Sequence, residues 1–406
     1  MLLFSVSLVL LAYVLIRFVV PLRCGLFAKL LMAAALIAVS RKFQIYERIG
    51  GSLFAPDLPR PFLLIMELSY AALLVLALLL LARDMALLVL LLARRAGRRW
   101  RPPFSPDRQK AGLAVIALAC GAFGVWQSLR VPDIRTVEVA VPHLPRELDG
   151  FSLVQLSDLH VGPLLQRDWL REVVKKTNAL TPDLVLLTGD MIDGDPERLR
   201  EEVQPLAGLA ARHGVYGVAG NHEYYYGVRA WTSVFENLGV TMLCNEHRTI
   251  PVGESGIVIA GIADPAAAKF GETLPDAAKA LEGAPETIRL LLAHQPGAAS
   301  ENREADLQLS GHTHGGTMFF LKPLVAAFNK GLVRGLYDRD GKQIYVSPGT
   351  GIWNGFSCRL GVPAEMTRIV LRTGLRVDPP TEEREHGCPS ARPVAMLVPL
   401  SCVHPL

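Results

Sequence analysis

The segment Val154-Gln-Leu-Ser-Asp-Leu-His160 is an apolar run that ends in an acidic side chain and an imidazole. The run over 151–156 has the length and composition of a buried β-strand. Successive side chains of an extended chain point to alternate faces, so residues two positions apart share a face. Asp158 and His160 are therefore expected on one face, where they could chelate a single metal ion together.

Four further apolar runs also end in acidic, amide or imidazole side chains. These runs cover residues 184–187, 215–219, 288–292 and 307–309. Sheets of α/β proteins gather their ligand sites at the carboxyl ends of the strands, so we expect these side chains to cluster. The residues that follow the runs are, in chain order, Asp190, Asp193, Asn221, His222, His294, His312 and His314.

The pattern around these runs predicts the fold class. Residues 257–260 and 344–346 also have the composition of strands. The stretch 167–179 has the periodicity of an amphipathic helix, and 197–211 predicts a second helix. Alternating strands and helices predict an α/β domain that is built on sheets with helices outside.

The residue types at the strand ends are those that bind divalent cations. Carboxylate, imidazole and amide groups suit Mn, Fe or Zn, and Mg less well. His312 and His314 repeat the spacing of Asp158 and His160, so each pair could chelate together. The six cysteines include no CxxC pair, which argues against a cysteine zinc site, and their disulfide pairing stays open. Two ions that share one carboxylate would use seven candidates: Asp158, His160, Asp190, Asn221, His294, His312 and His314.

Five motifs follow one another in the order seen in calcineurin-like metallophosphoesterases, and the chain resembles that family. They are Asp-x-His from residue 158, Gly-Asp-x-x-Asp from 189, Gly-Asn-His-Glu from 220, the single His294, and Gly-His-x-His from 311. The flanking sequences 154–160, 182–190 and 309–316 are similar to the membrane-anchored bacterial branch. The resemblance covers about residues 131–376, and the ordered set of motifs makes it specific.

The resemblance implies a four-layer sandwich, in which two mixed β-sheets are flanked by helices. It implies two metal ions bridged by Asp190, and it assigns His222 to phosphate contact and assistance of the leaving group. It also implies that Asp193 orients a ligand. Thr317 departs from the family pattern, where a glutamine is expected, but it occupies no ligand position. The implied ligands are Asp158, His160, Asp190 and His314 for one ion, and Asp190, Asn221, His294 and His312 for the other.

Such a site implies metal-dependent hydrolysis of a phosphoester. The candidates are a phosphodiester or a pyrophosphate, including those of a lipid or envelope precursor. Two cations about 4 Å apart lower the pKa of a water between them, so that hydroxide exists at neutral pH to attack phosphorus. The alternative is a non-catalytic metal-binding receptor or scaffold on the same fold, and metal-dependent turnover separates the two. Transport by the apolar helices is a third hypothesis, for which Glu67 is the best support.

The apolar part of the chain precedes this domain. Half of the residues are hydrophobic, and they are concentrated before residue 130. A helix needs about 20 apolar residues to cross a bilayer core. We therefore expect a transmembrane region over 1–130, a catalytic domain over 131–376, and a disordered tail over 377–406. The expected membrane helices are 2–20, 26–40, 61–82 and 111–129.

The basic residues are concentrated in one loop. Residues 94–110 contain seven Lys or Arg and one Asp, which leaves about −2 for the rest of a chain whose net charge is +4. No nucleic-acid-binding surface is therefore expected. Basic loops stay in the cytoplasm, so the fourth helix should carry the catalytic domain to the extracytoplasmic, periplasmic side. The expected partners are the lipid bilayer and a phosphoester substrate that could be lipid-linked.

Overall fold

The computed structural model describes residues 2–96, 104–339 and 341–374. Its centre is a pair of six-stranded sheets. The first sheet has the order β1 (Asp133–Val141), β12 (Glu365–Thr373), β2 (Ser152–Leu156), β3 (Leu184–Thr188), β4 (Val215–Val218) and β5 (Val240–Met242). The second has the order β10 (Gly335–Arg339), β11 (Lys342–Val346), β9 (Leu307–Ser310), β8 (Ile288–Leu292), β7 (Ser255–Gly261) and β6 (Glu246–Val252).

Both sheets are mixed. In the first, β12 runs antiparallel to β2, while the other pairs are parallel. In the second, β6 with β7 and β10 with β11 are antiparallel, whereas β7, β8, β9 and β11 run parallel. Together with the helices outside, these sheets confirm the predicted sandwich.

The core between the sheets explains why the strands read as continuous apolar runs. Leu153 and Leu186 of the first sheet belong to one buried cluster with Ile259, Leu290 and Leu309 of the second. The outer face of the first sheet packs under α6 (Arg167–Asn178) and α9 (Val228–Asn237). Because β2 and β3 are covered on both faces, all of their residues are buried and no polar alternation is needed.

One predicted helix is wrong. The stretch 197–211 is not a single helix but a short α7 (Pro196–Leu199) and a 3-10 turn (Gln204–Gly208). Pro205 has no backbone N–H with which to continue a helix, and Gly208 has a low helix propensity. Five strands, β1, β5, β6, β10 and β12, were not predicted from the sequence.

The part before β1 is helical. It comprises α1 (Leu2–Val14), a π-helical continuation (Leu15–Val19), α2 (Leu26–Ser40), α3 (Lys42–Arg48), α4 (Arg60–Arg95) and α5 (Pro106–Leu129). The predicted span 61–82 is therefore part of a longer helix, since α4 continues through Asp84, which binds Arg17 at 2.7 and 2.8 Å. By length and composition, α4 and α5 are apolar enough to cross a membrane.

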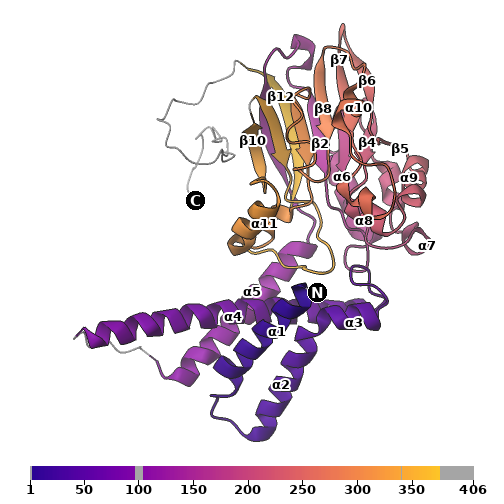
Figure 1. Ribbon diagram of the computed structural model, residues 1–406. Coiled ribbons are helices and arrows are strands. Elements are labelled where there is room, and N and C mark those ends of the chain that lie inside the picture. Colours follow the sequence, from indigo (N-terminus) through magenta and orange to yellow (C-terminus); the bar gives the residue numbers. More distant parts are fainter. Residues whose placement is uncertain (1, 97–103, 340, 375–406) are drawn as a thin grey trace, which may run out of the picture.

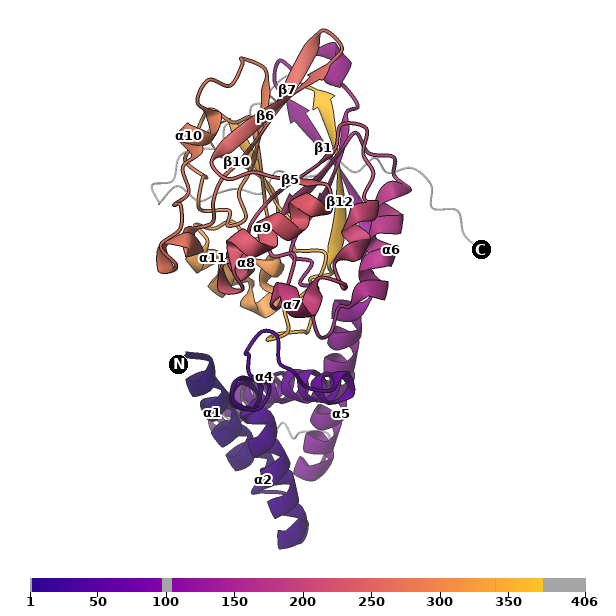
Figure 2. The ribbon, with the colours of Figure 1, turned by 90° about the vertical axis from the view of Figure 1, so that its right-hand side faces the viewer.

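The helical part lies on one side of the sandwich. Figures 1 and 2 show its helices beneath the end of the sandwich that carries α7, α8 (Asn221–Tyr225) and α11 (Lys322–Phe328). Helix α5 leads directly into β1. The predicted tail over 377–406 lies outside the described residues.

Candidate metal centre

The candidate ligands all follow strand ends at the same end of the sandwich. Asp158 comes after β2 and Asp190 after β3, Asn221 begins α8 after β4, His294 comes after β8, and His312 after β9. The backbone is unusual here, because left-handed conformations are costly for non-glycine residues and gather at functional sites. The ligands with positive φ are Asp158 (52°), His160 (46°), Asp190 (53°), His312 (68°) and His314 (48°).

A first group of donors joins Asp158, His160 and His314. Their ligand atoms all lie within 4.8 Å of one another. His160 Nε2 lies 3.2 Å from His314 Nε2, and the latter lies 3.5 Å from Asp158 Oδ1. Asp158 and His160 thus share a group.

A second group joins Asp190, His294 and His312, and Asn221 adjoins it. His294 Nε2 lies 3.1 Å from Asp190 Oδ2 and 3.2 Å from Asn221 Oδ1. Asp190 Oδ2 is also 3.8 Å from His160 Nε2, so this carboxylate lies between the two groups. His312 and His314 fall into different groups, which is the division between two ions that the family resemblance implies.

The arrangement of hydrogen atoms in the second group fits a cation. His294 Nδ1 donates to the carbonyl oxygen of Thr188 at 2.8 Å, which leaves a lone pair on Nε2 of the neutral ring. This lone pair faces the oxygens of Asp190 and Asn221, which are acceptors as well. Three acceptors repel one another unless a positive charge lies among them. Buried oxygen and nitrogen donors without a thiolate suit Mn, Fe or Zn.

The raised pKa of His294 also shows that this group of acceptors favours a positive charge. Burial opposes protonation of this imidazole, but Asp190 outweighs burial and raises its pKa well above the usual value. A proton on Nε2 and a metal ion at the same place therefore compete for one set of acceptors. Metal binding at this group should release that proton.

The protonation states of two other candidates agree with ligand chemistry. Burial alone would raise the pKa of Asp190, but the imidazoles of His294 and His222 hold it well below its usual range. Burial, assisted by His294, lowers the pKa of His312 to about 3. Asp190 is therefore a carboxylate and His312 a neutral imidazole at pH 7, the forms in which these groups bind metals.

Asp193 orients two of the histidines. Its Oδ1 accepts hydrogen bonds from His222 Nδ1 at 2.5 Å and from His160 Nδ1 at 2.9 Å. The backbone N–H of Asn354 donates to the other oxygen at 3.3 Å. This directs His222 Nε2 toward the centre, where it lies 3.9 Å from Asp190 Oδ2. Burial opposes ionisation of His222, but Asp190 and Asp193 outweigh it and raise its pKa to about 9.

Glu223 and Arg359 also belong to the site, although the sequence analysis gave them no role. The Glu223 carboxylate accepts from the backbone N–H groups of Asp190, Met191 and Gly220 at 3.0, 2.7 and 2.6 Å, which joins two ligand loops. Its place in the Gly-Asn-His-Glu motif was the available signal. Arg359 is buried and lies 3.4 Å from His314 Nδ1, and no motif marks it.

Gly220 and Gly311 are required by close approach. A Cβ on Gly220 would lie 2.3 Å from Asp190 Oδ1, and one on Gly311 would lie 2.2 Å from Asp158 Oδ2. Any larger residue would displace these two carboxylates from the centre.

A loop from the helical part covers His222. Phe54, in the α3–α4 loop (residues 49–59), has its ring centroid 4.9 Å from that of His222. It stacks on Tyr225 at 5.7 Å and meets Trp353 edge-on at 5.4 Å. Ser52 Oγ is 3.0 Å from the Tyr226 hydroxyl and fixes the loop. Tyr225 and Trp353 thus both pack against Phe54, and Tyr225 also lies beside His222.

A buried ion pair joins the helices to the loop that carries Asn354. Lys42 Nζ lies 3.0 Å from both carboxylate oxygens of Glu67 and donates to Gly355 O at 3.0 Å. The N–H of Ser357 donates to Glu67 at 3.1 Å. These contacts give Glu67 a structural role as a link between the helical part and the sandwich.

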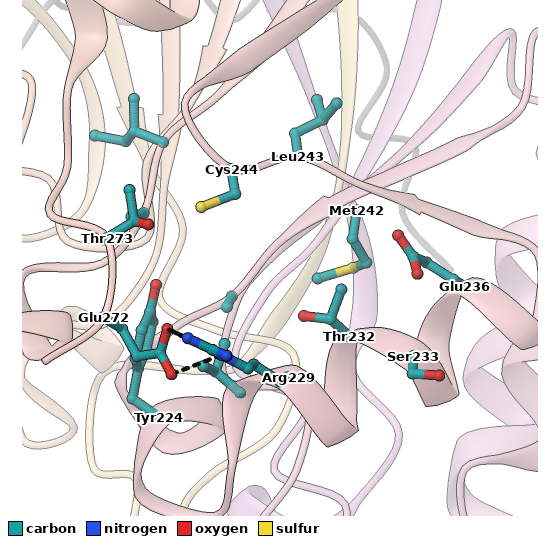
Figure 3. A pocket seen from close by; sticks show the side chains of 14 residues that line it. Tyr224, Arg229, Thr232, Ser233, Glu236, Met242, Leu243, Cys244, Glu272 and Thr273 are labelled. Carbon is teal, nitrogen blue, oxygen red and sulfur yellow. Dashed lines mark hydrogen bonds and ion pairs between the residues drawn. The ribbon is translucent and has the colours of Figure 1, made fainter. Parts of the chain in front are cut away.

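A separate cavity of about 290 Å³ lies between α9 and the β5 edge. Tyr224, Met242, Cys244 and Thr232 line it, and an ion pair between Arg229 and Glu272 stands at its wall (Figure 3). None of the metal-ligand candidates lines this cavity, so it is distinct from the site above.

Comparisons with known proteins agree with these motifs. A family model described as calcineurin-like phosphoesterase matches residues 151–316. A Danio rerio transmembrane protein with metallophosphoesterase domain is 36% identical over 277 residues, which cover 65% of this chain and 63% of the relative. The chain thus matches less than two thirds of that relative's length.

Two bacterial relatives are matched over more of their length. An uncharacterized metallophosphoesterase of Helicobacter pylori is 37% identical over 280 residues, covering 66% of this chain and 73% of the relative. An uncharacterized metallophosphoesterase of Aquifex aeolicus is 31% identical over 263 residues. The match covers 63% of this chain and 98% of the relative.

Proposed function

This chain belongs to the calcineurin-like metallophosphoesterase family, and we propose that it hydrolyses a phosphoester bond with two divalent cations. The observation that carries the proposal is that the ligand atoms form two adjacent groups, one of Asp158, His160 and His314 and one of Asp190, His294 and His312, with the Asp190 carboxylate between them. Asp158, His160, Asp190 and His314 would hold the first ion, and Asp190, Asn221, His294 and His312 would hold the second. Mn, Fe or Zn fits this donor set better than Mg.

The side chains around the ions have separate roles in the proposed reaction. When bound, the two cations neutralise phosphoryl charge and lower the pKa of a water between them. Asp193 fixes His222 through Nδ1, so Nε2 is presented to the departing oxygen. The neighbouring carboxylates favour the imidazolium form, which can donate a proton to that oxygen. Asp193 therefore acts through the two histidines that it holds.

The membrane assignment rests on several features. The apolar helices α4 and α5 and the description of the Danio rerio relative support a membrane-anchored enzyme. The α3–α4 loop contacts the site, so this loop and the catalytic domain lie on the same side of the membrane. The basic segment 94–110 runs from the end of α4 into the first turns of α5. The other end of α5 leads into the sandwich, which supports an extracytoplasmic catalytic domain. We assign 1–130 to the membrane region and 131–376 to the catalytic domain.

The substrate we propose is a phosphodiester or pyrophosphate, with lipid or envelope precursors favoured by the anchoring. A non-catalytic metal-binding scaffold is the second candidate function. It has no need of the Asp193–His222 pair, which lies at 2.5 Å beside the ligand groups.

The test is hydrolysis of a bis-aryl phosphodiester and its monoester by the full-length protein in detergent. Reactions with Mn²⁺, with a chelator, and with the variants His222→Ala and Asn221→Ala are compared, and bound metal is counted. We expect His222→Ala to keep two metals and lose about 10²–10⁴-fold in turnover. Asn221→Ala should lose metal. Two bound metals without turnover of either ester favour the scaffold, and absence of metal binding contradicts both functions.

A further inference from the structure

The segment that follows the ligand His314 exposes an apolar surface. Phe319 is 66% exposed, Leu324 57% and Phe328 79%. After residue 130, six large apolar side chains of the described chain are exposed, and three of them lie between Phe319 and Phe328. Soluble surfaces rarely concentrate apolar side chains in this way unless something covers them.

The buried side of the same segment packs against an apolar helix. Met318 belongs to one buried cluster with Ala71 of α4 and with Cys358, and Phe320 and Leu321 pack at its edge. The segment is therefore held beside the part of α4 that is apolar enough to span a bilayer.

The neighbouring loop is attached to the other long helix. The N–H of Phe319 donates to Leu360 O at 2.9 Å, and the N–H of Arg359 donates to Gly124 O of α5 at 3.0 Å. Helices α4 and α5 are themselves exposed through apolar side chains such as Ile65, at 64%. The apolar surface of the segment thus continues that of the two helices.

We propose that residues Phe319–Phe328 lie in the membrane interface and contact the lipid bilayer next to α4. The segment has the composition of an interfacial helix, with apolar side chains and the exposed Lys322, whose long stem can reach anionic headgroups. A second copy of the chain is the other candidate cover, but the continuity with α4 and α5 favours lipid.

The membrane contact bears on the substrate, and this step rests on the proposed function. Lys322, at the start of α11, is close to the ligand loop, since a Cβ on Gly316 would lie 3.1 Å from its Cα. Membrane contact by α11 therefore places the His314 side of the metal centre at headgroup level. The substrate class is a phosphoester of a membrane lipid, which reaches the site from the bilayer.

The membrane contact is tested by quenching of tryptophan fluorescence. The full-length variants Phe328→Trp and Thr249→Trp are reconstituted in phosphatidylglycerol vesicles with and without brominated acyl chains, and the wild-type signal is subtracted. Thr249 is exposed on β6, a strand that Figure 1 shows in the upper part of the sandwich, away from the helical part. We expect bromine to quench the added signal of Phe328→Trp at least twofold more than that of the control. Equal quenching in both variants overturns the proposal, and unquenched fluorescence with concentration-dependent dimers assigns the surface to a second copy.

The substrate class is tested with the triple variant Phe319→Ser/Leu324→Ser/Phe328→Ser. Bis-aryl phosphodiester turnover in detergent should stay within twofold of wild type. Hydrolysis of phosphatidylglycerol or diacylglycerol pyrophosphate in vesicles should fall at least tenfold. If the wild type hydrolyses the bis-aryl ester but neither lipid, the lipid substrate is wrong and the function stands. If the wild type hydrolyses no ester, the proposed function fails, while the quenching result still decides the membrane contact.

Discussion

The ring of Phe54 lies 4.9 Å from the imidazole of His222, so a residue of the helical part packs directly on a candidate catalytic residue of the sandwich. Phe54 also contacts Tyr225 and Trp353, and its loop is tied to the sandwich by an Arg198–Asp57 ion pair at 2.6 Å. The catalytic site therefore extends beyond residues 151–316, which the family model matches. Residues 131–406 alone would lack this wall.

Replacing Phe54 should reduce turnover without removing metal. The Phe54→Ala variant loses the surface that limits rotation of the His222 ring, and we expect kcat for the bis-aryl ester to fall about tenfold. Phe54→Leu keeps an apolar contact and should fall less. Kinetics and metal counting on the full-length protein check this. Unchanged kcat in Phe54→Ala would show that the loop is only a cover.

Replacing Asp193 should weaken metal binding and catalysis together. An asparagine has one oxygen acceptor and an NH₂ donor, so it cannot reproduce the carboxylate that orients His160 and His222. We expect Asp193→Asn to lower metal affinity about 10–100-fold. Metal titration followed by turnover at saturating metal separates the two effects. The neighbouring, exposed Asp195→Asn is the matched control and should leave both unchanged.

Replacing Lys42 alone should destabilise the protein more than replacing both Lys42 and Glu67 with apolar residues. Lys42→Met leaves Glu67 buried without its charged partner, at a cost of about 3–5 kcal/mol. The double variant Lys42→Met/Glu67→Leu should melt at a higher temperature than Lys42→Met. Thermal unfolding in detergent measures this, with the exposed Arg41→Met as control. A double variant less stable than Lys42→Met contradicts the expectation.

Stability should depend on pH through Lys342. Burial lowers the pKa of Lys342 to about 7, whereas an unfolded lysine titrates near 10.4. Between these values the unfolded chain binds more protons, so the contribution of Lys342 to stability rises with pH. We expect the wild type to gain in melting temperature relative to Lys342→Met from about pH 7 to pH 10. The same comparison with the exposed Lys330→Met should show no such trend.

Several of the strands that the sequence predicted are buried on both faces. β2, β3 and β8 read as apolar runs because a second sheet and outer packing cover them. Four missed strands, β1, β5, β6 and β10, stand at the edges of the two sheets, where one side has no strand partner. Edge strands carry polar residues that hide their strand character, as in β6, where only Ile250 is buried.

The ligand candidates could be found because each directly follows a strand that is itself predictable. Asp158 and His294 needed only the local pattern. Phe54 could not be found in this way, nor could the structural role of Glu67, because the contacts of both residues join the helical part to the sandwich. Both the 158/160 and the 312/314 pairs have left-handed backbone, so the rule for extended chains describes neither pair.

The position of β12 sets the order in which the protein can be completed. This strand lies between β1 and β2, although it is the last described strand to be synthesised. While the ribosome works, β1 therefore has no partner, and the first sheet stays open until residue 373 has emerged. Pairings of such long sequence separation form slowly. The helices can insert before then, so the hydrolase matures only after its chain is already tethered.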